Sequence, residues 1–200
     1  MIIINAGLGN FNSVLNMIRK CGSDALLTHS YDEVKKSKKI ILPGIGSFDE
    51  LILSLDKYSL RKAICEAVDN GSYLLAICVG MQILFDSSEE GKLNGLSLIK
   101  GKVKKFKFEN NILPVPHMGW NNINIKKKSK LFTDQSLQIK FYFAHSYYGV
   151  CHNKEDELSS TNYSINFSSS VEKNNIFGVQ FHPEKSHKFG YELFNNFIAL

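Results

Sequence analysis

The segment Tyr73–Phe85 reads YLLAICVGMQILF, and more than any other stretch it decides how this chain folds. The apolar run Tyr73–Ile77 predicts a strand that is buried on both faces, because it shows no alternation with polar residues. Gly80 follows shortly afterwards, and the apolar residues of 81–85 have a pattern typical of a helix. Cys78 is therefore predicted at a sharp turn from strand to helix, the geometry that lifts a nucleophile out of a sheet.

A cysteine at such a turn is a candidate nucleophile. The N-terminus of the following helix offers free N–H groups and a positive dipole end, both of which favour the thiolate over the thiol. A lone cysteine in a buried strand is more often a small hydrophobic residue. The assignment of Cys78 as a nucleophile therefore depends on chemical partners elsewhere in the chain.

A base and a carboxylate to orient it come from the segment Gly178–Glu184, GVQFHPE. The preceding residues Ile176–Phe181 are rich in β-branched and aromatic side chains and predict a strand. In extended backbone His182 and Glu184, two residues apart, project to the same face. Glu184 can then orient the imidazole of His182 toward the thiol of Cys78, which completes an activated-nucleophile triad.

The third segment is the loop Pro43–Phe48, PGIGSF, which follows the short apolar strand Lys39–Leu42. Gly44 and Gly46 allow the backbone to turn tightly and to present N–H groups toward a ligand. Together with the N–H of Val79, directly after the cysteine, this loop is suited to hold the oxyanion of an acyl transfer.

In this order and spacing, the three segments resemble the class I (triad) glutamine amidotransferases, and among them the glutaminase subunits of imidazole glycerol phosphate synthase. The resemblance runs nearly from end to end. One departure is the opening Asn5-Ala6-Gly7, where the family usually has an acidic residue and an aromatic before the first glycine. The further segments that carry the resemblance are Gly9-Asn10, Ser13-Val14, Gly95–Ile99, PHMGWN at Pro116–Asn121, His145–Tyr147 and FHPEKS at Phe181–Ser186.

This resemblance implies a glutaminase that hydrolyses glutamine to glutamate and ammonia without a metal or an organic cofactor. It implies a heterodimer with a (β/α)₈ cyclase subunit, which uses the ammonia to make imidazole glycerol phosphate and AICAR in histidine biosynthesis. It also implies that the subunit is switched on when docked. The loop Pro43–Phe48 is the expected switch, because its glycines permit a peptide flip that turns an N–H into the oxyanion site.

The resemblance assigns further residues to the substrate and to the partner. Gln82, one helical turn after Cys78, is expected to contact glutamine, as are Ser146 and Tyr147. His145 is a weaker candidate base than His182, because no carboxylate lies two residues away. The residues expected at the partner interface are Asn10, Met118, Trp120 and Lys185. Trp120, the one tryptophan, is either a core residue or an interface anchor.

Composition limits the possible classes of protein. The 200 residues, 44% of them hydrophobic, predict one domain spanning 1–200. We expect no transmembrane segment or signal peptide, and the four scattered cysteines without a C-x-x-C pair argue against a zinc site or disulfides and for the cytoplasm. The net charge of +5 comes from lysine runs rather than from interleaved arginines and aromatics, so a nucleic-acid groove is not expected.

The order of elements predicts an α/β fold. Strands and helices alternate in the first half, so we expect a mostly parallel central sheet with helices on both faces. From about Gly95 the pattern changes to short strands, which predict antiparallel additions to the sheet. Beyond the strands already named, we expect strands at 2–4, 25–29, 102–108, 122–125, 139–143 and 163–167, helix within 51–70 and 189–198, and a polar loop at 153–160.

Three other functions stay open at this point. The same chemistry could supply ammonia to another acceptor, such as an amidino-sugar pathway, and the opening Asn5-Ala6 keeps this alternative in view. A cysteine peptidase or esterase can use a similar turn. A binding protein that has lost its activity is disfavoured, because it need not keep a nucleophile, a base and a carboxylate.

Overall fold

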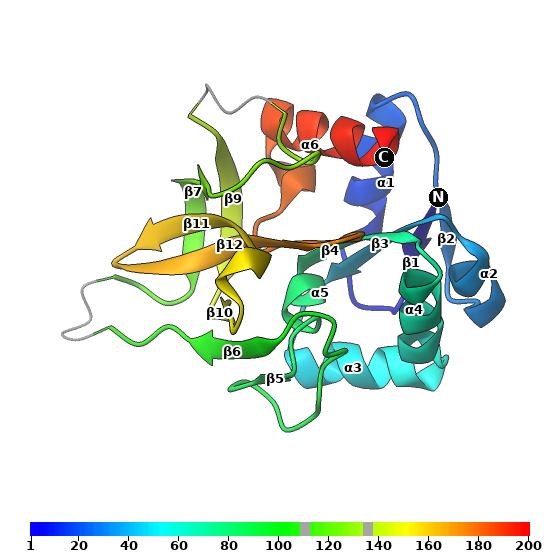
Figure 1. Cartoon of the computed structure of the whole chain (residues 1–200), viewed down its shortest axis with the longest axis horizontal. Coiled ribbons are helices and arrows are strands. Elements are labelled where there is room, and N and C mark those ends of the chain that lie inside the picture. The colour runs from blue at the N-terminus through cyan, green and yellow to red at the C-terminus, as the bar shows by residue number, and fades with distance from the viewer. Residues whose placement is uncertain (109–112, 134–137) are drawn as a thin grey trace.

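The computed structural model describes residues 1–108, 113–133 and 138–200. Within these ranges a mixed sheet of eleven strands forms the centre of the molecule, and helices lie on both of its faces (Figure 1). Its parallel half has the order β2-β1-β3-β4-β13. These strands are β1 (Ile2–Ile4), β2 (Leu26–Thr28), β3 (Lys39–Gly44), β4 (Tyr73–Cys78) and β13 (Ile176–Val179).

The sheet continues beyond β13 with mostly antiparallel strands, in the order β12-β10-β6-β5. A separate antiparallel pair, β7 with β9, stands beside this half of the molecule (Figure 1). The expected α/β architecture is confirmed. These strands are β5 (Ser87–Ser88), β6 (Gly101–Lys105), β7 (His117–Asn122), β8 (Asn124–Ile125), β9 (Lys140–His145), β10 (Tyr147–Cys151), β11 (Glu157–Tyr163) and β12 (Ile165–Lys173).

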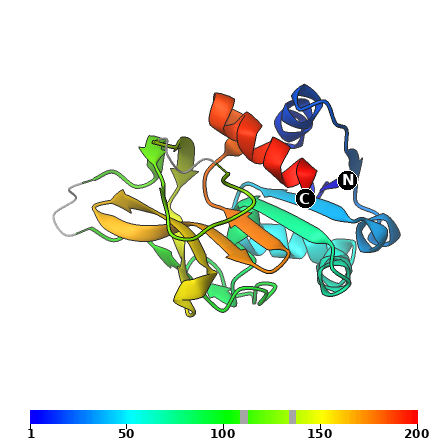
Figure 2. The ribbon, with the colours of Figure 1, turned by 45° about the horizontal axis from the view of Figure 1, so that its top comes forward.

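The helices cover the parallel half of the sheet. Helices α1 and α6 lie side by side on one face, and α3, α4 and α5 lie on the other (Figures 1 and 2). The last helix buries an apolar stripe of Phe189, Leu193, Phe194 and Phe197. The helices are α1 (Phe11–Lys20), α2 (Tyr31–Lys36), α3 (Phe48–Lys57), α4 (Leu60–Asp69), α5 (Val79–Gln82) and α6 (His187–Ala199).

Strand β4 lies between β3 and β13, and this neighbourhood positions the site. In the parallel registers, Gly44 is opposite Cys78 and Val179 is opposite Ile77. The glycine loop, the cysteine turn and the segment with His182 therefore all leave the sheet at the same carboxyl edge, where ligands bind in such sheets.

Two helix expectations need correction. Helix within 51–70 is two helices, α3 and α4, separated at Ser59, whose φ of 55° is left-handed. The helix expected over 81–85 is the single turn α5, which runs from Val79 to Gln82. It stops because the loop 95–99 bonds to its end: Leu96 N–H donates to the carbonyl of Ile83 (2.7 Å) and Ile99 N–H to that of Leu84 (3.0 Å). A helix this short contributes little dipole, so only its free N–H groups remain available for the thiolate.

The second half contains the larger errors of the sequence analysis. The strand expected at 163–167 straddles a hairpin turn at Ser164 (φ 61°), and the loop expected at 153–160 already contains the start of β11. The strands β11 and β12 are rich in serine, a residue that is more typical of loops. These serines are nevertheless buried and form hydrogen bonds with one another: Ser159 Oγ lies 2.9 Å from Ser169 Oγ and 2.6 Å from Ser170 Oγ. The strand expected at 122–125 is divided between two strands: Asn122 ends β7, and Asn124–Ile125 form β8.

No helix in the described part of the chain is both long and apolar enough to span a membrane.

Candidate active site

Cys78 is the last residue of β4 and begins a tight turn into α5. Its φ of 57° and ψ of −114° are sparsely populated for a residue with a side chain, so the packing around it must hold this conformation. Gly80 makes that packing possible, because a Cβ there would lie 2.1 Å from the carbonyl oxygen of Leu42. A Cβ on Gly44 would lie 2.5 Å from the backbone nitrogen of Gly80. The backbones of β3 and α5 are thus in direct contact beneath the cysteine.

His182 and Glu184 form a buried pair, with 2.8 Å between His182 Nδ1 and Glu184 Oε1. The backbone that joins them is not the extended strand the sequence analysis assumed. Strand β13 ends at Val179, and Pro183–Lys185 form a 3-10 helix (η3). Proline has no N–H to continue a ladder, and it favours the first position of a helix. The tight turn brings the carboxylate back to the imidazole.

The charge state of His182 follows from its neighbours. Burial alone lowers the pKa of His182, but hydrogen bonding and charge interaction with Cys78 and Glu184 raise it to about 10. Because the carboxylate oxygen can only accept, Nδ1 carries a proton and Nε2 is the nitrogen left for the thiol. This arrangement favours the imidazolium form of His182.

The other three cysteines lie in different environments. Burial raises the pKa of the Cys21 and Cys65 thiols, and it raises the pKa of Cys151 to about 11. All four cysteines are free thiols. Cys21, Cys65 and Cys151 therefore stay protonated at neutral pH.

A pocket of about 320 Å³ opens beside Cys78. Five of the residues expected to bind substrate or oxyanion line it with the cysteine, namely Gly46, Val79, Gln82, Ser146 and Tyr147. Gly44 does not line the pocket. It instead provides the close approach between β3 and α5 described above.

Gln82 has a more constrained place than expected. Its side chain is buried, and Nε2 donates to the carbonyl of Tyr147 (3.1 Å) and to Gln180 Oε1 (3.1 Å). Gln180 in turn donates from Nε2 to Cys78 Sγ at 3.8 Å. Gln180 was not predicted as a site residue, although a polar residue within the apolar run 176–181 was a usable signal.

Glu90 is the second residue that the sequence analysis missed. It lines the pocket, and its Oε2 accepts a hydrogen bond from the N–H of Phe48 (2.8 Å). Desolvation raises the pKa of Glu90, and the nearby charges of Asp49 and Glu50 add to this, although the Phe48 N–H opposes them. No pattern in the sequence marked this carboxylate, because it sits in an irregular loop.

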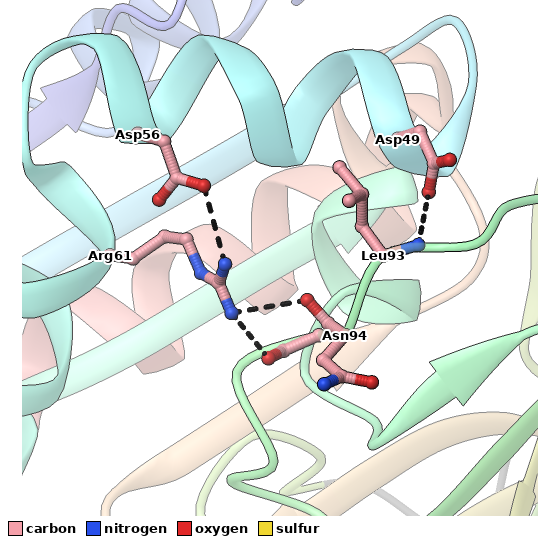
Figure 3. Close-up of polar contacts among 6 residues, drawn as sticks. Asp49, Asp56, Arg61, Leu93 and Asn94 are labelled. Atoms are coloured by element: carbon pink, nitrogen blue, oxygen red, sulfur yellow. Dashed lines mark hydrogen bonds and ion pairs between the residues drawn. The ribbon is translucent and has the colours of Figure 1, made fainter.

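The loop that carries Glu90 is held by side chains of α3 and α4 (Figure 3). Asp49 accepts from the N–H groups of Lys92 (2.9 Å) and Leu93 (3.1 Å). Arg61 Nη2 donates to the carbonyl oxygens of Asn94 (3.1 Å) and Gly95 (2.8 Å). These bonds fix the pocket wall to the helical layer.

His145 lines the same pocket but does not act like a base toward Cys78. Its Nδ1 lies 2.7 Å from the carbonyl oxygen of Tyr147, and its Nε2 lies 3.0 Å from Nδ1 of His117. Burial lowers the pKa of His145 to about 3 and that of His117 to about 4. Both ring nitrogens of His145 are thus occupied, in agreement with its lower rank as a candidate base.

The surface around the pocket is partly apolar. Met118 is 63% exposed and lines the pocket, while Trp120 is 44% exposed and stacks on His187 with 5.6 Å between ring centroids. Trp120 is therefore a surface residue and not a core residue, and its role as an interface anchor stays a prediction. Of the other expected interface residues, Lys185 is exposed on η3, and Asn10 precedes α1 and is half-buried.

Comparison with known proteins agrees with this geometry. The model of the family described as glutamine amidotransferase class-I matches residues 2–200. The imidazole glycerol phosphate synthase subunit HisH 2 of Methanococcus maripaludis is 47% identical over 197 residues, covering 98% of this chain and 97% of that protein. The subunit HisH of Leptospira interrogans is 40% identical over 201 residues, covering 99% of this chain and 98% of that protein.

Solved structures of low sequence identity share the fold. The structure of PurLQS from Thermotoga maritima has a TM-score of 0.77 at 18% identity, covering 99% of this chain and 96% of that chain. A structure described as a glutamine amidotransferase has a TM-score of 0.73 at 16% identity, covering 100% and 98%.

Proposed function

This chain belongs to the class I glutamine amidotransferase family, and on that premise we propose that it is the glutaminase subunit of an imidazole glycerol phosphate synthase in histidine biosynthesis. The observation that carries the proposed chemistry is Cys78 on a strained turn in one buried site with the His182–Glu184 pair. In this proposal residues 1–200 act as one glutaminase domain, and the reaction is placed in the cytoplasm, which suits four free thiols.

In the reactive state the proton of Cys78 Sγ is held on His182 Nε2, so that the sulfur is a thiolate. The thiolate attacks the side-chain amide carbonyl of glutamine, and the carbon–sulfur bond forms as the carbonyl oxygen gains negative charge. His182 then gives its proton to the leaving nitrogen, so ammonia departs and a γ-glutamyl thioester remains. Water, deprotonated by His182, attacks the thioester and releases glutamate with the thiol restored. Glu184 holds the imidazole in the required tautomer throughout.

The oxyanion is stabilised by backbone N–H groups at the pocket floor. The N–H of Val79 follows the nucleophile directly, and Gly46 brings the glycine loop to the same cavity. Gly46 has a φ of +83°, so its neighbouring peptide planes can adopt orientations that other residues resist. Such preorganised donors lower the barrier where charge develops.

The amino-acid end of glutamine is held at the opposite wall. Ser146 and Tyr147 line that wall, and the carboxylate of Glu90 supplies a partner for the α-ammonium group. The half-buried position of Glu90 strengthens this attraction relative to an exposed carboxylate.

The ammonia is consumed by a (β/α)₈ cyclase subunit docked over the pocket mouth. Met118 and Trp120 offer the exposed apolar and aromatic contacts that dominate binding energy at interfaces, and Lys185 and Asn10 extend the surface. Docking there confines ammonia, which free in water at neutral pH is mostly protonated and unreactive.

The proposal is tested by measuring glutamate release from the chain alone and from the chain with the cyclase and its nucleotide substrate. We expect low release alone, strong activation in the complex, and glutamine-dependent synthesis of imidazole glycerol phosphate. Full activity in isolation would indicate a stand-alone hydrolase. Faster turnover of peptides or esters would indicate a peptidase or esterase. Activation by a different synthase would move the same chemistry to another acceptor, such as an amidino sugar.

A further inference from the structure

A continuous chain of buried and part-buried hydrogen bonds connects Cys78 with the strand that carries the exposed Met118 and Trp120. Its first half lies under the pocket. Gln180 Nε2 donates to Cys78 Sγ (3.8 Å), and Gln180 Oε1 accepts from Gln82 Nε2 (3.1 Å). Gln82 Nε2 also donates to the carbonyl oxygen of Tyr147 (3.1 Å).

The second half continues from that carbonyl to the surface of β7. His145 Nδ1 lies 2.7 Å from the Tyr147 oxygen, and His145 Nε2 lies 3.0 Å from His117 Nδ1. His117 Nε2 lies 3.3 Å from Asn121 Nδ2, which also donates to the carbonyl of Asn162 (3.0 Å). His117 and His145 are directly opposite each other in the β7–β9 pair.

The chemistry of these groups fixes where every proton sits. A carbonyl oxygen can only accept, so His145 carries its proton on Nδ1. Its neutral Nε2 then accepts, which requires the proton of His117 on Nδ1. The Nε2 of His117 is left as an acceptor, and Asn121 supplies the matching amide N–H. The hydrogen bonds therefore allow only the neutral Nδ1–H tautomer for each of the two rings, and neither ring can take a second proton without losing a bond.

The surroundings of the pair enforce this neutral state. The His117 ring stacks between Tyr163 (4.0 Å between centroids) and Phe143 (4.8 Å). Phe106 and Phe167 pack edge-on against it, at 6.4 and 5.8 Å. An aromatic enclosure of this kind desolvates a cation, in line with the lowered pKa of both rings.

We propose that His117 and His145 are positioning residues, which hold the pocket wall at Tyr147 and the sulfur of Cys78 in register with β7. The inference rests on the proposed glutaminase function. Successive side chains along a strand face opposite sides, so the side chain of His117 is buried in the interior while that of Met118 faces outward. A partner that shifts β7 by pressing on Met118 or Trp120 thus moves His117 and, through His145, the glutamine-binding wall.

The sharpest test is the substitution Asn121→Asp in the full chain with the cyclase bound. An aspartate can only accept, so it draws the His117 proton to Nε2 and leaves Nδ1 bare. His145 must then either take a second proton or lose its bond to His117. We expect the KM for glutamine to rise about tenfold, the scale of one lost buried hydrogen bond, with a much smaller change in kcat. Asn162→Ala is the matched control, because it keeps the carbonyl that Asn121 uses.

A second readout does not depend on turnover. Nitrogen-15 NMR of the imidazoles of the wild-type chain should show His117 and His145 as neutral Nδ1–H tautomers, and Asn121→Asp should change both. His117→Phe, which keeps the ring and removes the bonds, should raise the KM as Asn121→Asp does. Unchanged KM in both variants, or Nε2–H tautomers in the wild type, would overturn the inference. Absence of wild-type glutaminase activity with these tautomers present would overturn the proposed function instead.

Discussion

The buried ring of His145 should make this protein less stable in mild acid by an amount that can be worked from its environment. Burial lowers its pKa from 6.5 to about 3, so between these values the unfolded chain binds a proton that the folded chain refuses. A depressed folded pKa contributes stability that is complete above pH 6.5 and is lost as pH falls. For one group, acidifying from about pH 8 to about pH 5 should remove about 2 kcal/mol of unfolding free energy.

The assay is urea unfolding at a series of pH values for the wild type and for His145→Asn, which keeps an amide donor for the Tyr147 carbonyl. The difference between the two curves isolates His145. Other groups act in both proteins: His117, with its pKa near 4, adds a loss of the same sign. His182, raised to about 10, acts in the opposite sense, since its contribution is complete below pH 6.5 and fades toward pH 10.

We expect the stability advantage of the wild type over the variant to shrink by about 2 kcal/mol across this range. Two parallel curves would refute the reasoning, because they would mean that the ring is as easily protonated in the folded protein as in the unfolded chain.

Four other outcomes follow from the site. Cys78→Ala should reduce glutamine hydrolysis by at least about a thousandfold, while synthesis from added ammonium persists in the complex. Cys65→Ala is the matched control, and near-normal hydrolysis in Cys78→Ala would refute the assignment of Cys78 as the nucleophile. His182→Ala should approach that loss and Glu184→Ala should cost less, because the carboxylate orients the ring without taking its proton; equal and small losses in kcat/KM would contradict this. Gly91→Ala should raise the KM for glutamine, because its Cβ would lie 2.0 Å from Asp49 Oδ1 and would displace the loop that carries Glu90; an unchanged KM would show that the loop tolerates the shift. Trp120→Ala should weaken binding of the cyclase by about 2 kcal/mol in a titration, and unchanged affinity would place the interface elsewhere.

The sequence was sufficient for the parts of the fold that depend on continuous patterns. Apolar runs marked β1, β3 and β4, and the turn at Cys78 followed from the glycine after the strand. The pairing of His182 with Glu184 was predicted, but by the wrong backbone. Pro183 ends the strand there, and a turn achieves what extension was expected to do.

What could not be predicted depends on contacts between distant segments. The serines of β11 and β12 read as a loop because their hydrogen-bond partners lie on the neighbouring strand. Glu90 gained its place from tertiary packing and belongs to no local pattern. Gln180 interrupts an apolar run, but that run did not indicate that its side chain would reach Cys78. Likewise, nothing in the spacing of His117 and His145 indicated that one ring would face the other.

The contact between Gly44 and Gly80 limits the motion that is available to the glycine loop beside Cys78. One end of the glycine loop is pinned where these two backbones touch, with no room for a Cβ on either residue. The other end is pinned by the capping box of α3, in which Ser47 and Glu50 bond reciprocally. Only Ile45 and Gly46 lie between these two fixed points, so this segment is too short to move as a lid. We therefore expect that any activation through this segment is a rotation of one or two peptide planes, which needs no rearrangement of the sheet.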